Sequence, residues 1–102
     1  MGCPPKLTKD GYGVQMGTNH LGHALLLKIL TPHLIKAASP RVVSMTSSAW
    51  KWARPEKIQF VTLRSLEGVS PVNRYVQSKT ANMLYPQQFA KHNPQLTMDL
   101  LA

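Results

Sequence analysis

Tyr75 and Lys79 stand four residues apart in the segment YVQSK. On a helix, residues at positions i and i+4 share a face, so the phenol and the ammonium would be neighbours. A tyrosine phenol ordinarily has a pKa of about 10, which makes it a poor base near neutrality. A nearby ammonium favours the phenolate, and such a pair suits proton exchange with an alcohol or a carbonyl. The alternative is an ordinary pair of side chains on a helix surface.

Two further polar residues stand where this chemistry would use them. The run RVVSMTS, residues 41–47, is rich in β-branched residues and predicts a strand that ends at Ser47. Active groups in open α/β sheets lie at the carboxyl ends of strands, where a serine can bond a substrate oxygen. Asn19 interrupts an otherwise apolar helical segment, so its carboxamide needs a partner or a function. The alternative for Asn19 is a structural hydrogen bond.

Two other patterns are better explained as structural. Gly11, Gly13 and Gly17 suggest a dinucleotide-binding loop, but the residues before them, CPPKLTKD, predict no strand. We therefore favour ordinary glycines at the start of a helix. His20 and His23 lie three residues apart, but zinc needs three or four ligands, so we expect packed or hydrogen-bonded histidines and no metal site.

The elements that must position these residues follow from periodicity and from proline. The sequence predicts two long helices, with Pro32 kinking or ending the first and Pro86 interrupting the second. It also predicts strands before and after the second helix, and a strand or extended patch inside the connection that precedes it. The expected helices cover residues 14–34 and 73–90, the strands 41–47 and 96–102, and the extended patch 58–63.

Together these segments resemble the middle of a short-chain dehydrogenase/reductase. The segment DGYGVQMGTNHLGHALLLKILTPHL resembles the helix that carries that family's active-site asparagine. PRVVSMTSSAW resembles the strand that carries its serine, and YVQSKTANMLYPQQFA resembles the helix of its Tyr-x-x-x-Lys motif. The similarity is greatest to the retinol-dehydrogenase-like branch, especially its fungal members. It implies an α/β chain with part of a doubly wound, Rossmann-like fold.

The resemblance also implies a role for each site residue. Tyr75 would exchange a proton with the substrate hydroxyl or carbonyl. Lys79 would promote ionisation of the phenol, and both residues would contact the NAD or NADP cofactor at its nicotinamide ribose. Ser47 would orient the substrate oxygen, and Asn19 would anchor a water that links Lys79 to solvent.

The choice of serine depends on the alignment of the strand segment. Thr46, Ser47 and Ser48 are adjacent, and the resemblance places Ser47 on the active position. Alternation along a strand would turn Thr46 to the opposite face, which leaves Ser48 as the second candidate.

The length of the chain bears on how much of such a fold it can hold. A complete doubly wound sheet, whose strands each need a crossover of a dozen or more residues, does not fit into 102 residues. The family's glycine-rich phosphate loop, its cofactor-selecting residue and its Asn-Asn-Ala-Gly segment are not among these residues. We therefore expect residues 1–102 to be the central, catalytic segment of a truncated domain. It would lack the cofactor-binding half and the last strands, and would have negligible activity alone.

The charge balance raises the question of a polyanionic partner. Twelve Lys and Arg oppose four acids, for a net charge of +8. The basic residues are densest over residues 41–64, which include Arg54 and Lys57 with Trp50 and Trp52 nearby. Such a segment could contact phosphates and stack on bases, but the scattered charge argues against a specific nucleic-acid site.

A second alternative to an enzyme is an assembly module. Residues 24–30 are apolar on nearly all sides of the expected helix, which implies a covering partner. In the family resembled, the two long helices form a common dimer interface, which implies that this chain would pair with itself or with a full-length relative. The chain has no apolar run long enough to span a membrane and no secretory signal, which predicts a cytoplasmic protein with a small-molecule substrate.

Overall fold

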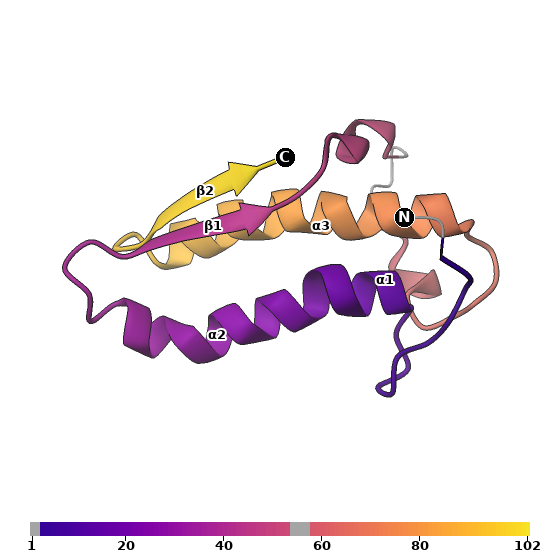
Figure 1. The fold of residues 1–102 in the computed structure, drawn as a ribbon, viewed down its shortest axis with the longest axis horizontal. Coiled ribbons are helices and arrows are strands. Elements are labelled where there is room, and N and C mark those ends of the chain that lie inside the picture. Colours follow the sequence, from indigo (N-terminus) through magenta and orange to yellow (C-terminus); the bar gives the residue numbers. More distant parts are fainter. Residues whose placement is uncertain (1–2, 54–57) are drawn as a thin grey trace.

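The structure is a computed structural model that describes residues 3–53 and 58–102. It is an α/β arrangement of helices against a two-stranded parallel sheet (Figure 1). In chain order its elements are α1 (Val14–Met16), a π-helical turn (Gly17–Leu21), α2 (Gly22–Leu34), β1 (Arg41–Met45), two 3₁₀ turns (Ser48–Trp52 and Phe60–Thr62), α3 (Pro71–His92) and β2 (Thr97–Leu101).

The first helical region confirms the expected helix over residues 14–34, with one irregularity. Its middle, Gly17–Leu21, is wound as a π turn that contains Asn19. Single π turns inside α-helices are frequently found at functional sites. Pro32 lies inside α2, which ends two residues later at Leu34.

The two strands pair with each other in parallel, and α3 is the crossover that connects them. Arg41 is opposite Thr97 and Met45 is opposite Leu101. Both long helices run opposite to the strand direction, and α2 lies alongside α3 in the view of Figure 1. The strand expected near the C-terminus is therefore confirmed, and the architecture is that of a partial Rossmann-like fold.

The second helix corrects one expectation. Pro86 was expected to interrupt it, yet α3 runs without a break through Pro86. A proline has no N–H to donate to the carbonyl four residues earlier, which is that of Asn82. The Ser44 hydroxyl of β1 donates to that carbonyl at 3.3 Å, so the sheet supplies the missing donor.

The connection before α3 differs from a second expectation. Residues 58–63 were expected to be a strand or an extended patch, but Phe60–Thr62 forms a 3₁₀ turn. The Gln59 N–H donates to the Gln77 side chain at 2.9 Å, and the Leu63 carbonyl accepts from the Gly13 N–H at 2.8 Å. These long-range bonds tie the segment to the helices instead of to a neighbouring strand.

The structure describes only part of the basic segment over residues 41–64. Arg54 and Lys57 lie outside the described residues. Arg41 forms an ion pair with Asp99 across the two strands, with 3.3 Å between nitrogen and oxygen. Arg64 lies over the Tyr12 ring, 4.5 Å from its centroid, and donates to the Asp10 carbonyl. At least two of the arginines, Arg41 and Arg64, therefore bind other residues of this chain.

The interior is small and unusually polar. Its buried apolar residues are Met16, Ala49, Val76, Ala81 and Leu96, and its buried polar residues are Gln15, Thr46, Gln77, Ser78, Thr80 and Asn82. Within residues 3–53 and 58–102, every buried side-chain nitrogen or oxygen has a hydrogen-bond partner. Specific hydrogen bonds therefore position α3 against its neighbours as much as apolar packing does.

Candidate functional site

The Tyr75–Lys79 pair lies on one face of α3, as the spacing predicts. The Lys79 ammonium lies over the Tyr75 ring, 5.7 Å from its centroid. Both side chains are partly buried, so each keeps access to solvent. The helix begins at Pro71 after Ser70, whose hydroxyl accepts from the Asn73 N–H at 3.2 Å and caps the first turn. The pair sits on the second and third turns of this capped helix.

The π turn brings Asn19 to the same part of α3. Its Nδ2 donates to the Ser78 hydroxyl at 2.9 Å, and that hydroxyl donates to the Tyr75 carbonyl at 2.7 Å. Ser78 has no exposed surface. The Ser78 side chain thereby links Asn19 to the backbone of Tyr75. The structural hydrogen bond that was the alternative for Asn19 is present, and it lies within the candidate site.

Ser78 and Asn82 are site residues that the sequence reasoning missed. The Asn82 Nδ2 donates to the Asn19 carbonyl at 2.7 Å, so both ends of Asn19 are held by α3. A signal was available, since positions 75, 78, 79 and 82 follow the i, i+3, i+4, i+7 spacing of one helix stripe. Polar residues fill that whole stripe, which indicates a hydrogen-bonding face.

β1 ends at Met45, two residues before the end expected at Ser47, so Thr46 and Ser47 follow the strand, where their hydroxyls have different partners. Thr46 is buried and donates to the Lys79 carbonyl at 2.6 Å. Ser47 has extended backbone angles, and its hydroxyl accepts from the Ala49 N–H at 3.2 Å, which caps the 3₁₀ turn that follows. Among the described residues, no hydrogen bond joins Ser47 to Asn19, Tyr75 or Lys79. Thr46 therefore contacts α3, the helix that carries Tyr75 and Lys79, and Ser47 is the next residue along the chain.

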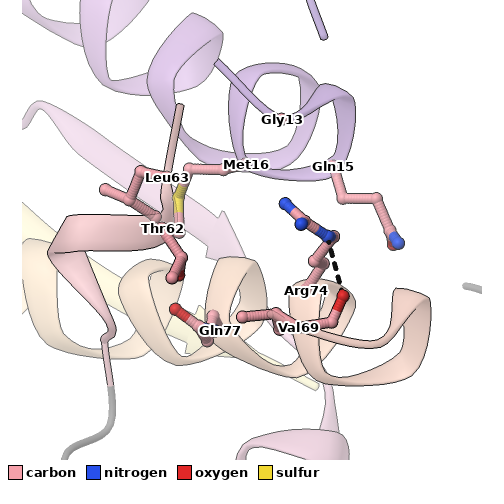
Figure 2. Close-up of a pocket in the computed structure, with 8 residues that line it drawn as sticks. All are labelled: Gly13, Gln15, Met16, Thr62, Leu63, Val69, Arg74 and Gln77. Atoms are coloured by element: carbon pink, nitrogen blue, oxygen red, sulfur yellow. Dashed lines mark hydrogen bonds between the residues drawn. The ribbon is translucent and has the colours of Figure 1, made fainter. Parts of the chain in front are cut away.

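The glycine pattern at the start of α1 has its N–H groups occupied. The Gly11 N–H donates to the Thr8 carbonyl, and the Gly13 N–H donates to the Leu63 carbonyl. Gly13 faces a cavity of about 20 Å³, in which Arg74 approaches it from α3 and donates to the Val69 carbonyl (Figure 2). These amides serve internal packing, in agreement with the structural explanation of the glycines.

The paired histidines are also hydrogen-bonded within the fold. The His20 Nδ1 lies 2.9 Å from the Asn82 Oδ1, and the His23 Nδ1 lies 3.0 Å from the Asn19 carbonyl oxygen. His20 also packs edge-on against Tyr85, with ring centroids 5.4 Å apart. This is the packed and hydrogen-bonded state favoured for them over a metal site.

The chain is similar in sequence to known dehydrogenases. No family model matches the chain. It is 40% identical over 91 residues to retinol dehydrogenase 12 of Homo sapiens and 36% identical over 89 residues to retinol dehydrogenase 14 of Mus musculus. It is 32% identical over 96 residues to the chloroplastic short-chain dehydrogenase TIC 32 A of Brassica napus.

These matches cover most of this chain and a minor part of each relative. They span 87% to 89% of the chain but only 26% to 30% of those three relatives. The crystal structure of an uncharacterised protein of Mycobacterium paratuberculosis superposes with a TM-score of 0.78 at 34% identity, over 94% of this chain and 35% of that one. No helix within the described ranges is both long and apolar enough to cross a bilayer. Over nearly nine-tenths of its length, the chain is similar in sequence to a part of several retinol dehydrogenases and of a short-chain dehydrogenase.

Proposed function

We propose that this chain carries the proton-transfer part of an NAD(P)-dependent oxidoreductase that interconverts an alcohol and a carbonyl compound. The observation that carries the proposal is the Lys79 ammonium over the Tyr75 ring, 5.7 Å from its centroid, on a partly buried helix face. The similarity to dehydrogenases along most of the chain supports it. Residues 1–102 would act as the central, catalytic segment of the domain.

The roles follow from the hydrogen-bonding capacity of each group. The Tyr75 hydroxyl would give its proton to a carbonyl oxygen, or take one from an alcohol in the reverse direction. The Lys79 ammonium would stabilise the phenolate that this transfer leaves. Ser47 would donate to the same substrate oxygen, and Asn19 would hold a water near Lys79.

A nicotinamide cofactor would supply the hydride, which no side chain can provide. Tyr75 and Lys79, whose hydroxyl and ammonium are polar and partly exposed, suit the ribose next to the nicotinamide ring. The glycine amides near α1 do not suit the diphosphate, because protein carbonyls occupy them. The chain would therefore provide the nicotinamide end of a cofactor site. The names of the relatives make retinol and similar apolar alcohols the first substrates to test.

The experiment grafts this chain in place of the matching stretch of human retinol dehydrogenase 12 and measures retinol oxidation and the reverse reaction. Tyr75→Phe should lower kcat by about 10²-fold or more, because it removes the exchangeable proton. Tyr85→Phe is the matched control, since Tyr85 is on the same helix but packs against His20 and Phe89. Full activity of the Tyr75→Phe graft would refute the proposed role.

The chain by itself should not sustain turnover. Among residues 3–53 and 58–102, no glycine-rich loop follows a strand, so this part of the chain offers no such site for the diphosphate of the cofactor. We expect no steady NADPH consumption when the purified chain is mixed with a panel of aldehydes. Consumption that Tyr75→Phe abolishes would contradict the expected inactivity while supporting the role of the tyrosine.

A further inference from the structure

Asn82 is the most heavily hydrogen-bonded side chain next to the candidate site. It is only 5% exposed and lies three residues after Lys79 on α3. Its Nδ2 donates to the Asn19 carbonyl at 2.7 Å and to the Met45 carbonyl at 3.1 Å. Its Oδ1 lies 2.9 Å from the His20 Nδ1. One carboxamide thus joins α3 to the π turn and to the end of β1.

The chemistry of these partners fixes the orientation of the carboxamide. Two carbonyl oxygens, those of Asn19 and Met45, face one end of it, and a carbonyl can only accept. That end must be the NH₂ group, so the oxygen faces His20. Since an amide oxygen can only accept, the His20 Nδ1 must carry the proton. The structure therefore assigns His20 the Nδ1–H tautomer when its ring is neutral.

Neither of the two residue types closest to asparagine in shape or volume satisfies all three partners. Aspartate has the same shape but would point an acceptor at two carbonyl oxygens, with no proton between them. Leucine has a similar volume but leaves the two carbonyls and the imidazole without this partner. The Asn82 backbone carbonyl, which Pro86 deprives of its helical donor, is bound by the Ser44 hydroxyl. The position is thus fixed from both its side chain and its backbone.

We propose that Asn82 is a positioning residue that holds the π turn, and with it Asn19, against the helix of Tyr75 and Lys79. The role in catalysis rests on the proposed function, whereas the hydrogen-bond assignment stands without it. Asn82 acts through the Asn19 carbonyl and through His20, and it does not need to touch substrate.

The first test uses the unmodified full chain and needs no activity. A long-range ¹H–¹⁵N correlation spectrum of the ¹⁵N-histidine-labelled protein, recorded where the imidazoles are neutral, distinguishes the two tautomers. We expect Nδ1–H for His20, and also for His23, which donates to the Asn19 carbonyl. The exposed His33 and His92 should show the Nε2–H form that free imidazoles favour. An Nε2–H tautomer for His20 would overturn the proposal.

Two variants of Asn82 then separate its functions. Asn82→Leu should return His20 to Nε2–H while the exposed His33 and His92, as internal controls, keep the tautomer that they have in the unmodified chain. Asn82→Asp should keep the His20 tautomer, because a carboxylate still accepts from Nδ1–H, but should increase the exchange rate of the Asn19 side-chain amide protons. A His20 tautomer that does not change in Asn82→Leu would refute the assignment.

These outcomes are independent of the proposed function. If the Tyr75→Phe graft described above proved fully active, the proposed function would fail and the His20 spectrum would still decide the role of Asn82. If the His20 tautomer were Nε2–H while Tyr75→Phe abolished activity, the positioning role would fail and the proposed function would stand.

Discussion

At the scale of single residues, the hydroxyl of Ser47 is suited to hold a substrate oxygen. It accepts the Ala49 N–H at 3.2 Å, which fixes its place two residues after the end of β1. A hydroxyl that accepts one bond still has its own proton to donate. The neighbouring Thr46 has no such capacity, because its proton is bound to the Lys79 carbonyl. The two adjacent hydroxyls therefore differ in function: one fastens the strand to the helix, and the other can face a ligand.

We expect Ser47→Ala to lower the kcat of the retinol dehydrogenase graft by about 10²-fold, as the loss of a hydrogen bond made to a developing oxyanion does. Ser48→Ala, the second candidate in the sequence, should change kcat less than twofold. The measurement is steady-state retinol oxidation by both variants. A large effect of Ser48→Ala alone would exchange the two assignments.

At the scale of elements, the π turn is packed tightly against the lead segment of the chain. Gly17 has helical backbone angles, φ −61° and ψ −46°, so alanine would be conformationally acceptable there. A Cβ at this position would lie 2.6 Å from the Thr8 Cγ2, closer than two such atoms can approach. The glycine is thus required by contact and not by conformation.

Gly17→Ala should therefore lower the free energy of unfolding, by about 1–3 kcal/mol, despite the better helix propensity of alanine. Thr8→Ser removes the clashing methyl and keeps the hydroxyl that accepts the Tyr12 N–H. The double variant should recover most of the loss in urea unfolding. An unchanged loss in the double variant would show that the contact with Thr8 is not the cause.

The second element with an unusual dependence is α3, where Pro86 relies on the sheet. The Ser44 hydroxyl donates to the Asn82 carbonyl, which receives no helical hydrogen bond because Pro86 has no N–H. In the unmodified chain, Ser44→Ala should cost about 1 kcal/mol of unfolding free energy. In a Pro86→Ala background the new N–H can bond the same carbonyl, so Ser44→Ala should cost less.

The coupling of positions 44 and 86 is measured by a double-mutant cycle in urea. Thr46→Val is the matched control, since its acceptor, the Lys79 carbonyl, keeps the N–H of Met83 as a helical donor. Thr46→Val should cost the same with or without Pro86. Zero coupling between Ser44 and Pro86 would contradict this explanation of the unbroken helix.

At the scale of the whole molecule, much apolar surface is uncovered. Its Cα radius of gyration is 14.4 Å, against about 13 Å for a compact domain of 100 residues. Leu25, Leu26, Ile29 and Leu30 of α2 are 41% to 60% exposed. An apolar helix face of this kind is typical of a surface that another polypeptide covers.

We expect the isolated chain to self-associate through this face of α2. Leu26→Gln with Ile29→Gln, which leaves the net charge unchanged, should shift sedimentation equilibrium toward the monomer. Val61→Gln is the control, because Val61 is 94% exposed but lies on the connection before α3. A monomeric unmodified chain at the same concentrations would contradict the expectation.

The sequence alone determined the order of the two long helices and the two strands, because each has its own local pattern. It also determined the shared face of Tyr75 and Lys79, because that depends on spacing along one helix. Only the tertiary structure decided that α3 continues through Pro86 and that Ser78 and Asn82 hold Asn19. The donor and acceptors in those bonds come from residues that are 38 to 63 positions apart in the chain. Such pairings depend on how the elements pack, and no local pattern encodes them.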